Sequence, residues 1–201
     1  MKVIFLDHDG VICLSHNWGS RYKKARKYMM DHGISDHDLA MADEGKRPLE
    51  TRFDNFDEKA IKTLNQILEE SGAEIVVSSD WKRWADVEEM GEYYEMQGIS
   101  KKPIAFTPSL QDCTNYPEDF PWSKTWDLEQ SRSVEIQQYL LDHPEVTHWV
   151  AIDDLNMGKK IRDGYRTYSH DWGLDNFVHT PKSSEGIKQS GIKDKVLKFL
   201  K

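Results

Sequence analysis

The sequence predicts an α/β fold in which helices cover both faces of a mainly parallel sheet. Short apolar runs bounded by polar residues are typical of buried strands, and helical periods lie between these runs. A polar cluster follows directly after each of the three main runs. Because ligands of such sheets bind at the carboxyl ends of the strands, we expect these clusters to meet on one rim.

The strands are predicted from the apolar runs themselves. Three of these runs are bounded by turn or polar residues, at residues 3–6, 75–77 and 149–152. Two shorter runs, at 104–106 and 177–178, predict two further strands.

The helices are predicted from apolar periodicity and from residues that stop a helix. Residues 57–71 place four apolar side chains on one face, and Gly72 ends the period. The same pattern predicts three more helices, at 83–97 before Gly98, 132–141 before Pro144, and 193–200.

Residues 14–55, the inserted segment, interrupt the alternation of strands and helices. We expect two helices there, at 21–32 and 36–43, joined through Gly33 and with Ser35 as the cap of the second. The inserted segment is therefore predicted to be a small helical cap after the first strand of a single domain covering residues 1–201. Residues 107–127 have no clean period and predict a long surface loop.

Composition limits the class of protein. A net charge of -8 argues against broad nucleic-acid binding, which relies on Lys and Arg to neutralise phosphates, although a local basic patch is compatible with it. The two cysteines, Cys13 and Cys113, lack the paired spacing of zinc or redox motifs. Polar residues interrupt every apolar stretch before the roughly 18 residues that a membrane-spanning helix needs. We therefore expect a cytoplasmic protein.

The first polar cluster is a pair of carboxylates directly after the first predicted strand. Asp7 and Asp9 are two residues apart, and Gly10 permits a sharp turn after them. By themselves these residues fit a simple turn as well as a catalytic pair. His8 lies between them and should point the other way along the strand, which indicates either a structural role or support of the site residues from behind.

Two more clusters follow the other main strands. Ser78 and Ser79 offer hydroxyl groups that can donate to a phosphoryl oxygen, although serines after a strand are often only turn residues. Asp153 and Asp154 are adjacent carboxylates, which repel each other unless solvent or a cation relieves the repulsion. The alternatives are a solvated loop and a magnesium site.

The order of these clusters resembles that of the haloacid dehalogenase (HAD) superfamily. Its first motif, Asp-x-Asp-Gly followed by a small or β-branched residue, is matched by "FLDHDGVI", its second-motif hydroxyl by Ser78, and its fourth motif by "VAIDDLN". The chain is most similar to the HAD domain of Swiss-army-knife RNA repair proteins. The stretches "FDEKAIKTLNQILEESGAEIVVSSDWK", "RSVEIQQYL" and "FVHTPKSSEGI" carry that resemblance, although Lys82 replaces the usual arginine.

The resemblance implies a three-layer Rossmann-like fold and a magnesium-dependent phosphomonoester hydrolase that forms an aspartyl-phosphate. It makes Asp7 the nucleophile and Asp9 the general acid and base. Arg132 matches the basic residue of the third motif, and Lys124 is its rival. The full implied set is catalytic Asp7, Asp9, Ser78 and Arg132; substrate-binding Ser79, Gly10 and Lys124; and, for Mg²⁺, Asp7, the Asp9 carbonyl and Asp154 ahead of Asp153.

The substrate is less constrained by the sequence. A small phosphorylated metabolite or a nucleotide is the first expectation, with a nucleic-acid end or non-catalytic phosphate binding as alternatives. The helix predicted at 21–32 carries cations that either attract an anion or form a solvated face, with Tyr22 and Ala25 inward. Three tryptophans could stack on a base or belong to the core: Trp81, Trp84 and Trp122.

Overall fold

The computed structural model describes residues 1–35, 47–114, 128–158 and 173–201. Within these ranges a single sheet has the strand order β3-β2-β1-β4-β5, and every neighbouring pair is parallel. Its strands cover all five runs predicted from the sequence, which confirms the predicted fold class. Their bounds are β1 Lys2–Leu6, β2 Glu74–Val77, β3 Pro103–Phe106, β4 His148–Asp153 and β5 Phe177–His179.

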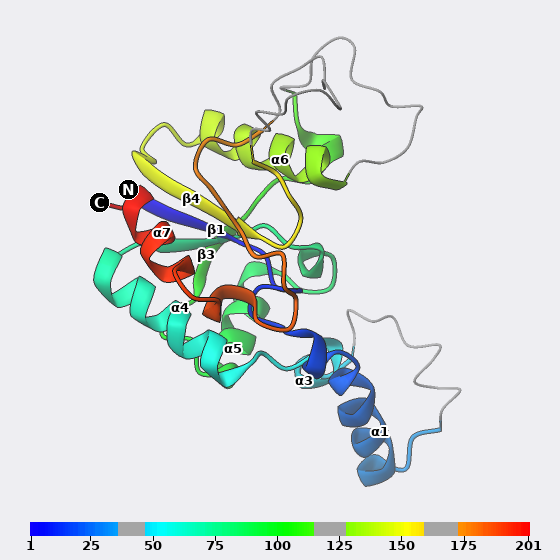
Figure 1. Cartoon of the computed structure of the whole chain (residues 1–201). Coiled ribbons are helices and arrows are strands. Elements are labelled where there is room, and N and C mark those ends of the chain that lie inside the picture. The colour runs from blue at the N-terminus through cyan, green and yellow to red at the C-terminus, as the bar shows by residue number, and fades with distance from the viewer. Residues whose placement is uncertain (36–46, 115–127, 159–172) are drawn as a thin grey trace, which may run out of the picture.

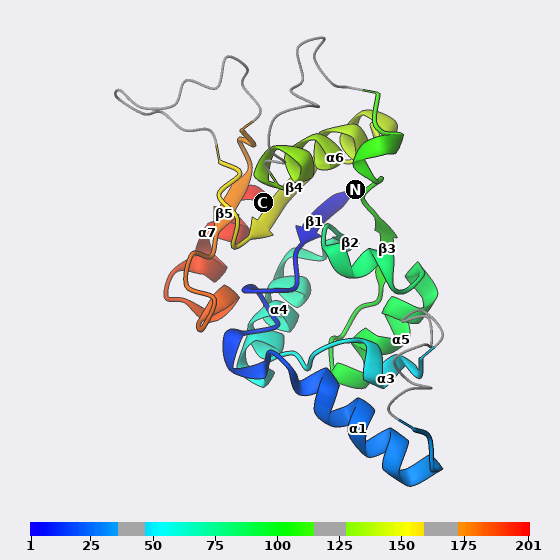
Figure 2. The same ribbon diagram turned by 90° about the vertical axis from the view of Figure 1, so that its right-hand side faces the viewer.

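Helices lie on both faces of the sheet and make three layers (Figures 1 and 2). Side chains alternate along β1, so Ile4 and Leu6 pack in the larger core cluster while Val3 and Phe5 pack in the other. The larger cluster includes residues of α4 (Glu58–Ser71), α5 (Val87–Gln97) and α7 (Ile192–Phe199), and the smaller one includes residues of α6 (Leu128–Asp142). Apolar strands covered on both faces explain the continuous apolar runs in the sequence.

Helix α4 follows the prediction closely. The Asp57 side chain accepts a hydrogen bond from the backbone N–H of Ala60, and Gly72 ends the helix in the left-handed conformation at φ 70°. The predicted helix over 83–97 is shorter than expected, because Asp86 and Glu89 form a capping box that starts α5 at Val87. A short 3-10 helix, η3, precedes it at Asp80–Arg83.

Helix α6 begins before the predicted position. It starts at Leu128, so Arg132 lies inside the helix and does not open it. The side chain of Ser133 donates to the backbone carbonyl of Glu129, which is one turn of helix ahead of it. Part of the predicted loop is ordered as the 3-10 helix η4 at Leu110–Asp112, and residues 115–127 lie outside the described residues.

The inserted segment contains η1 (Ser15–Asn17), α1 (Ser20–His32) and α3 (Leu49–Arg52) in its described part. Helix α1 was predicted, α3 was not, and the helix expected at 36–43 lies outside the described residues. Ala25 is buried as expected, but Tyr22 is 64% exposed, so the prediction that it faces inward was wrong. Helix α1 extends away from the sheet, next to α3 (Figures 1 and 2).

The described helices are all too short or too polar to span a lipid bilayer.

Candidate active site

The polar clusters after β1, β2 and β4 lie on one rim of the sheet, at the carboxyl ends of these strands. The backbone N–H of Asp7 donates to the carbonyl of Ile152 at 3.1 Å, and that of Ser78 donates to the carbonyl of Leu6 at 2.9 Å. The hydrogen bonds of the sheet therefore continue to the first residue of each cluster. They hold Asp7 and Ser78 at neighbouring positions on the central strands.

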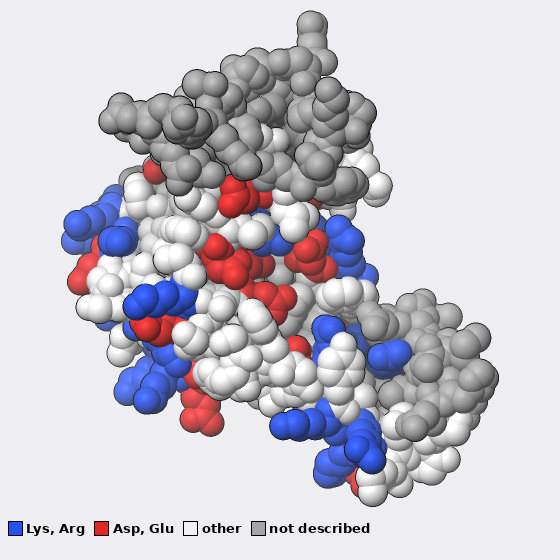
Figure 3. Space-filling view, turned by 45° about the vertical axis from the view of Figure 1, so that its right-hand side comes forward, with Lys and Arg blue, Asp and Glu red and all other residues white. Residues whose placement is uncertain are grey.

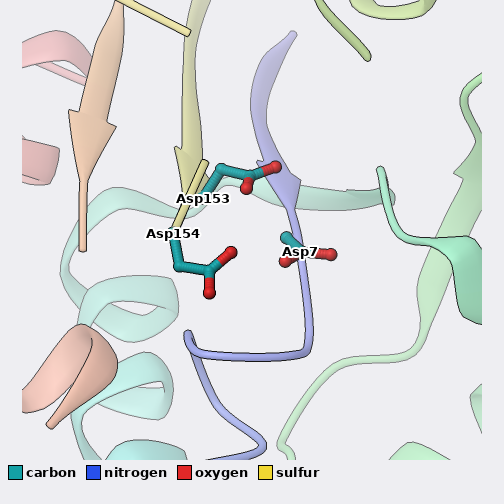
Figure 4. A group of neighbouring side chains, drawn as sticks. All are labelled: Asp7, Asp153 and Asp154. Carbon is teal, nitrogen blue, oxygen red and sulfur yellow. The ribbon is translucent and has the colours of Figure 1, made fainter. Parts of the chain in front are cut away.

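Three carboxylates converge at this rim. One oxygen from each of Asp7, Asp153 and Asp154 lies within 4.8 Å of the others. Asp153 and Asp154 come from the end of β4 and face Asp7 at the end of β1 (Figure 4). Asp7 is only 3% exposed and Asp153 only 1%, so their negative charges are screened little by solvent.

Arg132 of α6 reaches this acidic group from the neighbouring layer. Its Nη1 lies 2.8 Å from Oδ2 of Asp153 and 3.1 Å from Oδ1 of Asp7. Its Nη2 lies 3.7 Å from Oδ2 of Asp80, which follows the serine pair. One guanidinium thus bridges carboxylates from β1 and β4, where a third-motif basic residue was expected, whereas its rival Lys124 lies outside the described residues.

Negative charge exceeds positive charge in the acidic group. Burial raises the pKa of Asp7 well above its usual value, and although Arg132 lowers it, the nearby Asp153 and Asp154 raise it further. Burial and the charge of Asp153 raise the pKa of Asp154 to about 6. An excess of carboxylate oxygens at close range is the donor set that hard cations such as Mg²⁺ prefer. These residues therefore fit a magnesium ion.

Gly10 allows the chain to pass close to the acidic group. Its φ of 69° lies in the left-handed region, and a Cβ at this position would overlap the Asp154 carboxylate. The carbonyl of Asp154 in turn is 2.8 Å from Nε2 of His179, at the end of β5. A glycine is thus required here both by backbone conformation and by space.

Ser78 and Ser79 are both 2% exposed at the end of β2. Within the described part of the chain, the buried Oγ of Ser78 has no hydrogen-bond partner. An unpaired buried hydroxyl costs free energy unless a ligand or water satisfies it. Its place beside Asp7 leaves this hydroxyl able to donate to a ligand bound at the rim.

Asp9 has different surroundings from Asp7, and its side chain does not belong to the acidic group. Its Oδ2 accepts a hydrogen bond of 2.8 Å from Nε1 of Trp81, and the thiol of Cys13 also hydrogen-bonds to it. Burial raises the pKa of Asp9 in spite of these bonds. A carboxyl group that protonates more readily than usual suits a general acid.

His8 belongs to the core, as strand alternation predicted. It is fully buried, its Nε2 lies 2.7 Å from the hydroxyl of Tyr94, and burial lowers its pKa to about 3. Trp81 is also buried, with 2% exposure, so of the two alternatives the structure supports the core position and not stacking on a base. Trp84 packs partly buried against the same core, and Trp122 lies outside the described residues.

Several residues near the site were missed by the sequence analysis. Asp80 contacts Arg132, and His179 contacts the Asp154 carbonyl. Asp54 accepts hydrogen bonds from the N-terminal backbone of α1, and its negative charge helps to raise the pKa of Asp9. Only Asp80 carried a signal in the sequence, since it directly follows the serine pair after β2.

Comparison with known families finds a match over nearly the whole chain. A family model described as "HAD domain in Swiss Army Knife RNA repair proteins" matches residues 3–189, which confirms the resemblance expected from the sequence. No curated protein and no solved structure matches the chain. The matched range includes all three clusters on the rim and the inserted segment.

Proposed function

The chain belongs to the family of HAD domains of Swiss Army Knife RNA repair proteins, and on that premise we propose that it is a magnesium-dependent phosphomonoester hydrolase. Membership supports the broader class, a hydrolase or phosphatase of the HAD superfamily. One observation carries the finer proposal: Asp7 lies in an acidic group with Asp153 and Asp154 and is paired with Arg132. A nucleophile, a cation site and a phosphate-binding cation are thus within reach of one phosphoryl group.

The magnesium ion would be held by Asp7, Asp154, Asp153 and the backbone carbonyl of Asp9. Asp154 is preferred to Asp153, because the Asp153 carboxylate already accepts from Arg132 and from the backbone N–H of Leu155. When bound, the ion would offset the negative charge of the transferring phosphoryl group.

In the proposed reaction a carboxylate oxygen of Asp7 attacks phosphorus while the bond from phosphorus to the leaving oxygen breaks. Asp9 gives its proton to that leaving oxygen, so the product departs as a neutral alcohol. Asp9 then takes a proton from a water molecule that attacks the aspartyl-phosphate. This second step releases inorganic phosphate and restores the Asp7 carboxylate and the Asp9 acid.

The remaining residues bind the phosphoryl group. The unpaired hydroxyl of Ser78 donates to one of its oxygens, and Arg132 stabilises the charge on others. Ser79 and Gly10 line the same rim, and Lys124, which lies outside the described residues, stays in the proposal as the alternative to Arg132. These roles need no rearrangement of the buried groups, since Asp7, Ser78 and Arg132 already lie at one end of the sheet.

We propose a small phosphorylated metabolite or nucleotide as the substrate, with residues 14–55 as a cap over the site of a single domain. Lys and Arg side chains gather on the part of the surface formed by α1, beside the acidic rim (Figure 3). Lys24 is not one of the cations left for a ligand, because its Nζ bonds to the Phe53 carbonyl and to Asn55. A cytoplasmic setting, in which the buried Cys13 and Cys113 stay reduced, is part of the proposal.

A nucleic-acid end is the second candidate substrate. The family description and the cations of α1 favour it, whereas the net charge of -8 counts against a large nucleic-acid surface. Non-catalytic phosphate binding is a third possibility, but a binding site has no need of Asp9 as a proton donor.

The test is phosphate release from a panel of nucleotides, sugar phosphates and phosphorylated oligonucleotides, with and without Mg²⁺. Release that requires Mg²⁺ and is lost in Asp7→Asn is the expected result, and the substrate with the highest kcat/KM identifies the class. No release by the folded wild type from any compound would overturn the catalytic proposal in favour of phosphate binding.

A further inference from the structure

Trp81 makes a directed contact with the carboxyl group proposed as the general acid. Its indole Nε1–H donates to Oδ2 of Asp9 at 2.8 Å, although the two residues lie 72 positions apart in the chain. An indole can only donate a hydrogen bond and never accept one. The Asp9 oxygen that faces Trp81 is therefore an acceptor in both protonation states of the carboxyl group.

The indole ring is held in place by the aromatic residues around it. Phe53 and Phe56 stack on it with ring centroids 4.9 and 5.5 Å away and interplanar angles of 12° and 16°. The His8 ring meets it edge-on at 4.7 Å. Close packing on these rings fixes the direction in which the indole N–H points.

Phe53 lies near the end of the inserted segment, and Phe56 lies just after it in the stretch that leads to α4. This stretch is itself anchored at both sides. Lys24 of α1 donates to the Phe53 carbonyl at 2.7 Å, and the Tyr93 hydroxyl of α5 donates to the Asp54 carbonyl at 2.9 Å. Any shift of the inserted segment relative to the sheet would therefore reach the indole ring through Phe53 and Phe56.

We propose that Trp81 is a positioning residue for the Asp9 general acid and that it couples the orientation of this acid to the inserted segment. The inference rests on the proposed phosphohydrolase function. Because Oδ2 accepts from the indole, the transferable proton is carried by Oδ1. In the first step the Oδ1–H bond breaks, a bond from that hydrogen to the leaving oxygen forms, and the electrons of the phosphorus–oxygen bond go to the leaving oxygen.

The Cys13 thiol does not replace this contact. It also hydrogen-bonds to Asp9, but a thiol is a weak donor, whereas the indole N–H is a strong one in a fixed ring. The loss of the indole N–H would leave the carboxyl group free to rotate and to present either oxygen to the leaving group.

The first experiment compares two substrates that differ in their need for a general acid. Trp81→Phe keeps an aromatic ring in the stack and removes the donor. The kcat/KM for an alkyl phosphomonoester, whose leaving oxygen must be protonated, is expected to fall roughly 10- to 100-fold. The kcat/KM for p-nitrophenyl phosphate, whose leaving group is stable as an anion, should fall less than about 3-fold.

Trp84→Phe is the matched control, since Trp84 lies three residues further along and packs partly buried against the same core. It is expected to leave the ratio of the two kcat/KM values unchanged. Phe56→Leu loosens the stack without touching the donor, so it should lower the same ratio by a smaller factor. Equal losses on both substrates in a folded Trp81→Phe protein would assign Trp81 a purely structural role and overturn the proposal.

A second measurement does not depend on activity. The indole N–H signal of Trp81 in a ¹H–¹⁵N spectrum is assigned by its absence from Trp81→Phe. Asp9→Ala is expected to shift that signal more than Asp7→Ala does, because the indole donates to Asp9 and alanine has no acceptor. If Asp9→Ala leaves the signal in place, the contact is absent and the proposal fails even where phosphate release is confirmed.

Discussion

The surroundings of Asp7 and Asp9 differ sharply, although only His8 separates them in the chain. Asp7 lies among charges, with Asp153 and Asp154 on one side and Arg132 bridging from α6. Asp9 lies in an aromatic region, formed by Trp81 and the rings packed around it, and its Oδ2 accepts a hydrogen bond from the neutral indole of Trp81. The charged region would suit an ionised nucleophile once a bound cation offsets the neighbouring carboxylates, which otherwise raise the pKa of Asp7, and the aromatic region suits a carboxyl group that holds a proton.

This difference shows how one strand end can supply two chemical roles. Alternation alone would point Asp7 and Asp9 to the same side, because they are two residues apart, but β1 ends at Leu6 and the chain turns at Gly10 directly after Asp9. Each carboxylate therefore meets partners from another part of the sequence. The proposed roles follow from these partners and not from the two identical side chains.

The largest effect is expected from removing the charge of the nucleophile. Asp7→Asn should lower phosphate release on the order of 10³-fold or more. It should not destabilise the fold, because burial and the neighbouring carboxylates raise the pKa of Asp7 and so disfavour its charged form. Phosphate release and thermal unfolding of the same preparation test both parts. A variant that keeps activity would place the nucleophile elsewhere.

Arg132→Met removes the positive charge from the charged region. It leaves the buried carboxylates of Asp7 and Asp153 without their cation, so the free energy of unfolding should fall by about 3 kcal/mol. Phosphate release should fall roughly 100-fold. Urea unfolding and kinetics provide the two measurements. Lys124→Met is the control, and a greater loss of activity there than in Arg132→Met would reverse the assignment of the third-motif residue.

His8→Gln tests how the stability of the aromatic region depends on pH. The pKa of His8 is about 3 in the folded chain against 6.5 for an unperturbed histidine, so the unfolded chain binds the proton more readily. Stability from neutral His8 is complete above about pH 6.5 and is lost as the pH falls towards 3. Near pH 4.5 this loss is about 3 kcal/mol. As the pH falls, the free energy of unfolding should decline less steeply in the variant than in the wild type. If the two curves of unfolding free energy against pH are parallel, His8 is not the group that causes the loss.

Asp57→Ala should have the smallest effect. It tests whether a loss of stability close to the aromatic region is enough to change catalysis. Asp57 caps α4 and pairs with Lys188 at 3.2 Å, so its loss should cost about 1 kcal/mol of stability. The ratio of kcat/KM for alkyl and p-nitrophenyl phosphates should not change. A change in that ratio would mean that general loosening, and not the Trp81 donor, controls Asp9.

Local patterns in the sequence were enough to predict the strands and most helices. Apolar runs located all five strands, and Asp57 and Gly72 marked the two ends of α4. The start of α5 was missed because a capping box of Asp86 and Glu89 outweighed the apolar period before it. Helix α3 was missed because four residues are too few to show a period.

The order of residues along the chain was enough to predict the α/β class, the resemblance to HAD domains and the polar residues at the three strand ends. The bridge from Arg132 to Asp7 and Asp153 and the hydrogen bond from Trp81 to Asp9 became visible in the folded chain alone. The residues in these contacts are 21 to 125 positions apart in the chain. They meet because of the order of the strands in the sheet and the packing of α6 on it. No local pattern records such contacts, because side-chain neighbours across a sheet are set by how the strands and helices assemble.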